Sequence, residues 1–136
     1  MHQDSFGFLL ETHLAVLREQ TTLLETPDPE PWGEVILPEA ETGLFEAVFG
    51  LVDPASMPLL RGRQVIVQLV AERSDGFLRL CYRVAFDLII DLQEPGLRQA
   101  LTEISAQAKA VGEGNSFILG YVRKGTEFTL EVKVRL

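Results

Sequence analysis

The chain is poor in cysteine and histidine, the residues that most often carry redox, nucleophilic or metal chemistry. It has one cysteine, Cys81, and two histidines, His2 and His13. A single thiol cannot form an internal disulfide, and no spacing of His, Cys or carboxylate residues resembles a set of metal ligands. The sequence therefore predicts a cytoplasmic protein with no metal and no cofactor, in which His13 has a structural role.

Positive charge is also in short supply. Twelve Lys and Arg stand against twenty Asp and Glu, which gives a formal net charge of -8 at pH 7. Such a charge repels phosphate backbones and anionic bilayers, so we expect neither nucleic acid nor a membrane as a partner. The apolar stretch Phe6 to Leu10 is too short to span a bilayer and follows Asp4 instead of a basic residue, so we expect no export signal.

Motifs that would name a reaction are absent. No serine lies in a G-x-S-x-G turn, and Gly112 and Gly114 follow a predicted helix, whereas a phosphate loop opens one. Arg79 and Arg83 flank Cys81 on one strand face, a setting that lowers a thiol pKa, but no neighbouring base is evident. We predict no catalytic residue, and a thiol-dependent enzyme using Cys81 is the least favoured alternative.

What the sequence does contain is a clear pattern of β-hairpins. Apolar and polar residues alternate from 126 to 136, which is typical of a strand buried on one face, and this strand is predicted to pair with 117–122. A second hairpin joins 65–72 to 77–92 through Asp75 and Gly76, where glycine supplies the positive φ of a tight turn. Two further strands are predicted at 35–37 and 44–52 from their short apolar runs, separated by a turn-forming segment from Pro38 to Gly43.

Two segments have helical spacing. Residues 5–25 carry an apolar stripe from Phe6 to Leu24 that Asp4 or Ser5 can cap, and 94–111 predicts a second helix. Between the first helix and the strands lies an acidic, proline-rich connector, 26–33, which cannot continue a helix. It contains Trp32, the only tryptophan, whose burial would pin the connector to the body.

These elements predict one α+β domain over residues 1–136. Strands gathered in hairpins favour a largely antiparallel sheet of about six strands with both helices packed on one face, in the order α-β-β-β-β-α-β-β. A closed barrel around one helix remains an alternative, because periodicity alone does not exclude it.

Surplus apolar surface suggests a function. Strands 65–72 and 117–122 are apolar on both faces, as is the predicted strand 44–52, which is more than two helices can cover. The first hypothesis is a non-enzymatic interaction module: a small adaptor or chaperone-like homodimer that presents apolar sheet surface, or the edge of strand 126–136, to a protein partner. The predicted partner-binding residues are Met57, Leu59, Leu60, Arg79, Arg83, Phe128, Leu130 and Val132.

A small-molecule pocket is the alternative hypothesis, with Tyr82 and the arginines supplying polar contacts. Several cations near hairpin ends or on the outer sheet face could gather into a basic patch, or could be ordinary salt-bridged surface residues. These cations are Arg61, Arg63, Arg79, Arg83, Arg123 and Lys124.

Overall fold

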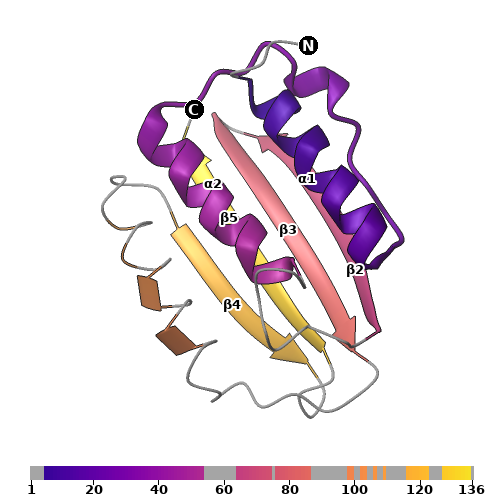
Figure 1. The fold of residues 1–136 in the computed structure, drawn as a ribbon. Helices are drawn as coiled ribbons and strands as arrows, with labels where there is room; N and C mark the ends of the chain where they lie inside the picture. The colour runs from indigo at the N-terminus through magenta and orange to yellow at the C-terminus, as the bar shows by residue number, and fades with distance from the viewer. Residues whose placement is uncertain are drawn as a thin grey trace.

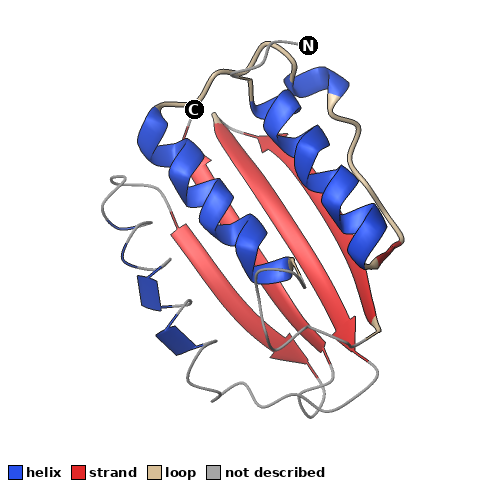
Figure 2. Ribbon diagram, viewed as in Figure 1, coloured by secondary structure: helices blue, strands red, loops and turns tan. Residues whose placement is uncertain are grey.

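The computed structural model describes residues 5–53, 64–74, 76–86, 116–122 and 127–135, together with positions 98, 99, 102, 103, 106 and 109. The molecule has two layers, a twisted β-sheet and helices lying across one of its faces (Figures 1 and 2). The predicted α+β class is confirmed. Among the described residues no helix is long and apolar enough to cross a bilayer.

Helix α1 spans Phe6–Gln20 and begins as the sequence predicts, with the Ser5 side chain accepting a hydrogen bond from the Phe8 amide at 3.1 Å. Its buried stripe includes Leu10, Leu14 and Leu17. The helix ends before residue 25 because Thr21 is extended and donates both its amide (2.8 Å) and its hydroxyl (2.7 Å) to the Leu17 carbonyl. The chain then enters the two-residue strand β1, Thr22–Leu23.

The prediction of a strand at 44–52 is wrong, because these residues form most of helix α2, Glu39–Val52. Pro38 is its N-cap, and Glu39 and Glu41 in the first turn favour the positive end of the helix dipole. Its buried residues recur at helical spacing and leave Glu46 exposed. They are Leu44, Phe45, Val48, Phe49, Leu51 and Val52.

The weaker strand predicted at 35–37 is also wrong in the described structure. Ile36 makes a single antiparallel bridge to Ser5, and the amide of Phe6 donates to the Val35 carbonyl at 2.7 Å. This segment therefore ties the connector to the start of α1. Within the connector, a 3-10 turn at Glu30–Trp32 buries the Trp32 ring against Phe6, with ring centroids 5.5 Å apart.

The described strands form one open sheet in the order β1-β2-β3-β5-β4, so no closed barrel forms from them. Strand β2 spans Val65–Ser74, β3 Phe77–Phe86, β4 Ser116–Val122 and β5 Glu127–Arg135. Both predicted hairpins are confirmed, β2 with β3 and β4 with β5, and Gly76 has the expected positive φ of 78°. The sheet has five described strands where about six were predicted, and it is mixed because β1 runs parallel to β2.

Strand β5 does not offer an open edge. It lies between β3 and β4 and is paired along both sides, which overturns the expectation that 126–136 could accept a strand from a partner. The backbone groups of β5 are already used by its neighbours. In the described sheet the outer strands are β1 and β4.

The helix predicted at 94–111 falls largely outside the described residues. The six described positions between 98 and 109 are helical and exposed. The Thr102 hydroxyl donates to the Arg98 carbonyl at 2.9 Å, and the side-chain amide of Gln99 donates to the Glu103 carboxylate at 3.3 Å. Both hydrogen bonds have the four-residue spacing of a helix. At these positions the structure is helical, as predicted for 94–111.

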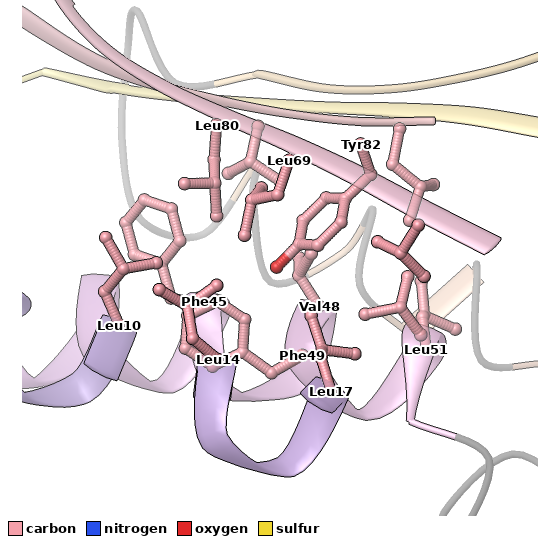
Figure 3. Close-up of a cluster of buried hydrophobic side chains, with 14 of the residues drawn as sticks. Leu10, Leu14, Leu17, Phe45, Val48, Phe49, Leu51, Leu69, Leu80 and Tyr82 are labelled. Carbon is pink, nitrogen blue, oxygen red and sulfur yellow. The ribbon is translucent and has the colours of Figure 1, made fainter. Parts of the chain in front are cut away.

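The core lies between the sheet and the two helices α1 and α2 (Figure 3). Alternate residues of β2, β3 and β5 point into it, as the period-2 pattern predicts. Apolar side chains of α1 and α2 meet them from the other side, so the helix layer and the inner sheet face cover each other. The residues with no exposed surface include Leu10, Leu14, Leu44, Phe45, Leu78, Leu80 and Val132.

Two glycines inside α2 allow the helix assignment to be tested. A Cβ atom added at Gly43 or Gly50 would meet no atom within 4 Å. In a helix interior, alanine is favoured over glycine by about 0.5–1 kcal/mol. We therefore expect Gly43→Ala and Gly50→Ala each to raise the free energy of unfolding by that amount in urea titrations. A loss of stability in both variants would contradict a helix here.

Candidate functional site

The outer face of the sheet carries two of the cations that the sequence singled out, Arg79 and Arg83, and acidic residues pair with them. Arg79 contacts Glu72 at 3.2 Å and Glu131 at 3.0 Å, and Arg83 pairs with Glu127. These are ordinary partly exposed ion pairs, which contribute little to stability, and they neutralise Arg79 and Arg83. Lys133 and Arg135 lie on the same face, over the Phe77 ring. Arg61, Arg63, Arg123 and Lys124 lie outside the described residues.

Cys81 lies between Arg79 and Arg83 on this face, as predicted. Burial raises the pKa of the Cys81 thiol, and the opposing effect of Arg79 does not outweigh it. The nearby carboxylates Glu131 and Glu72 raise the pKa further. A raised pKa reduces the thiolate fraction at neutral pH, so the geometry does not activate Cys81 as a nucleophile.

The five described residues of the predicted partner-binding set do not come together. Phe128, Leu130 and Val132 point to the helices and are buried in the core, so their side chains offer no surface to a partner. Arg79 and Arg83 lie on the opposite face of the sheet. Met57, Leu59 and Leu60 lie outside the described residues. On β2 the two-sided apolar pattern is confirmed, because Ile66 and Val70 are exposed on the outer face.

A buried polar contact links the sheet to the helix layer. The Tyr82 hydroxyl, which points from β3 toward the helices in Figure 3, shares a hydrogen bond of 2.7 Å with Nε2 of His13 on α1. The His13 ring also stacks on Phe49 of α2, with centroids 3.8 Å apart. A hollow of about 340 Å³ on the outer sheet face is lined by Arg79, Arg83 and Tyr82, among other residues. Tyr82 is 2% exposed and its hydroxyl is hydrogen-bonded to His13, so Tyr82 does not supply the polar contact of the alternative hypothesis there.

Burial decides the ionisation of this pair. Desolvation lowers the pKa of His13 from 6.5 to about 3 and raises the pKa of Tyr82 well above its ordinary value. Both groups are therefore neutral in the folded protein at pH 7. A neutral imidazole that is hydrogen-bonded and stacked fits the structural role predicted for His13.

This shift predicts a specific pH dependence. Because the pKa of His13 is about 3 when folded and 6.5 when unfolded, the unfolded chain binds the proton first as pH falls below 6.5. The contribution of neutral His13 to the free energy of unfolding is therefore complete above that pH and decreases as the pH falls toward 3. Between pH 7 and pH 5 it decreases by about 2 kcal/mol. We expect urea titrations to show this loss, and His13→Gln to remove most of the difference between the two pH values. An equal pH dependence in both proteins would contradict it.

Sequence reasoning missed a groove between α1 and α2. We call it the α1–α2 furrow, lined by Phe8, Leu9, Thr12, Ile36, Glu46 and Gly50. It consists of two hollows, of about 400 and 240 Å³, that share Leu9 and Glu46. The furrow could not be predicted because one of its walls was expected to be a strand. In the described part of the chain, no three His, Cys, Asp or Glu side chains gather to hold a metal ion.

Comparison with known proteins assigns the fold to a class. No family model matches the chain. No curated protein matches it either. Among solved structures, the fold is similar to that of histidine kinase domains, although the sequences are distant.

Two of these structures come from Erythrobacter litoralis. The chain matches the histidine kinase domain of the EL346 blue-light activated histidine kinase with a TM-score of 0.58 and 16% identity, over 97% of this chain and 61% of that one. It matches another structure of that kinase with a TM-score of 0.52 and 13% identity, over 95% of this chain and 41% of the other. The chain thus spans less than two thirds of either structure.

The shared fold corrects the functional prediction. A non-enzymatic adaptor or chaperone-like module was inferred from surplus apolar surface and from the lack of motifs, and the similarity to kinase domains overturns that inference. Part of the surplus was an error of assignment, since residues 44–52 are a helix whose apolar side covers the sheet. Self-association and a cytoplasmic location remain predictions.

Proposed function

We propose that this domain is a histidine-kinase-type signalling domain that binds a nucleoside triphosphate and takes part in transferring its phosphoryl group to a histidine. The observation that supports the proposal is the fold, which matches a histidine kinase domain over 97% of the chain. Because a fold can host several activities, the proposal rests on this analogy and needs a direct test.

The acceptor histidine is expected to be a residue other than His13. An acceptor imidazole must present a free nitrogen to the γ-phosphate, in line with the leaving oxygen. His13 is only 5% exposed, its Nε2 is bonded to Tyr82, and its ring is covered by Phe49. Phosphorylation there would require opening the core.

Electrostatics predict that the nucleotide binds only with its metal. Both the chain, with a formal charge of -8, and ATP are anionic, so the free nucleotide is repelled. Mg²⁺ bridging the phosphates lowers that repulsion and neutralises the charge that develops during phosphoryl transfer. Binding should therefore disappear when the metal is chelated.

Isothermal titration of the whole chain tests the proposal. We expect Mg·ATP to bind one site with a Kd between roughly 1 µM and 1 mM, the range in which enzymes commonly hold substrates. Mg·ADP should compete for the site, EDTA should abolish binding, and magnesium tripolyphosphate should bind more weakly because it lacks the nucleoside. The absence of saturable binding at millimolar Mg·ATP, by a chain that circular dichroism shows to be folded, would contradict the proposal.

A further inference from the structure

Among the described residues five large apolar side chains are exposed, and two of them, Phe8 and Ile36, lie in the α1–α2 furrow. Phe8 is 40% exposed and Ile36 is 53% exposed, and together they line the larger hollow. Leu9 is half-buried between the two hollows and lines both. α1 and α2 run side by side over the sheet (Figure 1), and residues of both helices line the two hollows.

One wall of the furrow is acidic along its length. Glu39 and Glu46 on α2 and Asp53, the C-cap residue of this helix, follow one another at seven-residue intervals and line the two hollows. Residues seven apart fall on nearly the same side of a helix, so the three carboxylates form a stripe about 21 Å long, at about 1.5 Å per residue. Gly50 lies on the same wall and has open space where a side chain would project.

We propose that the α1–α2 furrow binds an amphipathic helix of a partner protein, with apolar residues against Phe8 and Ile36 and lysine or arginine residues against the acidic stripe. An apolar groove between two helices suits the ridge of a third helix, and this is a recurring mode of peptide recognition. The acidic wall selects a cationic partner and orients it. The proposal does not depend on nucleotide binding, which concerns another property of the domain.

Charge also argues against a second copy of this chain as the occupant. Two copies that met through this groove would place their acidic stripes close together, and like charges at an interface disfavour the complex. On the outer sheet face, Arg79 and Arg83 are already paired with Glu72, Glu131 and Glu127, and Lys133 and Arg135 lie over the Phe77 ring. A heterologous basic helix satisfies the groove without breaking these pairs.

The probe for the test is a synthetic helix of about 15 residues, long enough to span the stripe, with leucines along one face and flanking lysines. A second peptide carries glutamate in place of each lysine. We expect the lysine peptide to shift the amide NMR signals of Phe8, Thr12 and Gly50. Its affinity should fall as the salt concentration rises, and the glutamate peptide should produce no shifts. Shifts confined to the outer sheet face would overturn the proposal.

Two variants separate the furrow from non-specific attraction to an acidic protein. Glu46→Lys should lower the affinity for the lysine peptide by about tenfold. Glu11→Lys makes the same charge change on an exposed α1 residue outside the furrow, and it should lower the affinity by less than about twofold. Gly50→Leu should place a side chain in the smaller hollow and block the peptide, and Gly50→Ala, whose Cβ meets no neighbour, should bind it more strongly than Gly50→Leu. Circular dichroism should show that both variants are folded.

Equal effects of the two charge reversals, or full affinity in Gly50→Leu, would overturn the proposal. So would a dimer of the wild-type chain in sedimentation experiments that Gly50→Leu converts to a monomer, because the groove would then belong to a second copy of this chain.

Discussion

Replacing Phe45 by alanine should lower the free energy of unfolding by about 3–5 kcal/mol, the usual cost of removing a buried phenylalanine ring. Phe45 has no exposed surface, and its ring packs against Phe6 of α1 with centroids 5.0 Å apart. Its removal leaves a cavity where the helix layer meets the sheet, and such a loss is a large share of the stability of a small domain. Urea titration followed by circular dichroism measures the change.

Phe8→Ala is the matched control. The chemical change is the same, but Phe8 is 40% exposed at the rim of the α1–α2 furrow, so the expected loss is below about 1 kcal/mol. Similar losses in the two variants would show that Phe45 is not in the core, and α2 would then not cover the sheet as described.

Gly7→Ala should destabilise the protein by about 1–3 kcal/mol, although alanine is the better helix former. A Cβ atom at Gly7 would lie 2.8 Å from backbone atoms of Gly33, Pro29 and Trp32. Because these are main-chain atoms of the connector, the clash can be relieved only by moving the connector away from α1. Trp32 is the only tryptophan and is buried, so a change in its fluorescence should accompany the loss of stability.

The sign of this effect is its test. The same substitution at Gly50, where a Cβ has open space, is expected to stabilise the protein. If Gly7→Ala were as stable as the wild type, or more stable, the close packing of the connector on α1 would be refuted. The pair of variants therefore reports on tertiary packing with helix propensity held constant.

Local patterns were sufficient to predict α1 and both hairpins. Ser5 supplies a cap, Gly76 supplies the positive φ of its turn, and strict alternation from Phe128 to Val134 sets the inner face of β5. Each of these signals lies within a few residues of the structure that it specifies. Sequence therefore predicts such elements well.

Helix α2 was missed because its apolar residues form a short, almost continuous run, and periodicity alone does not separate a buried strand from a buried helix in such a run. Pro38 and Gly43 predict a turn between two strands, whereas in the structure Pro38 caps the helix and Gly43 lies inside it. The wrong assignment also affected the functional prediction, because an extra strand with two apolar faces increased the apolar area for which a partner was inferred.

The candidate sites depend on contacts that no local pattern records. His13 and Tyr82 are 69 residues apart in sequence, and the walls of the α1–α2 furrow come from two helices of which one was unpredicted. Strand β1 has two residues, too few to show any period, yet its parallel pairing with β2 makes the sheet mixed. Only the packed structure brings these groups together.

The most direct test of this account is the backbone conformation of residues 39–52 in solution, because the core, the furrow and the similarity to kinase domains all require a helix there. NMR should show strong sequential amide–amide contacts from Leu44 to Val52, and side-chain contacts between the His13 and Phe49 rings. Strong sequential Hα–amide contacts with cross-strand partners for Leu44 to Val52 would contradict the account, and the functional proposals would lose their structural basis.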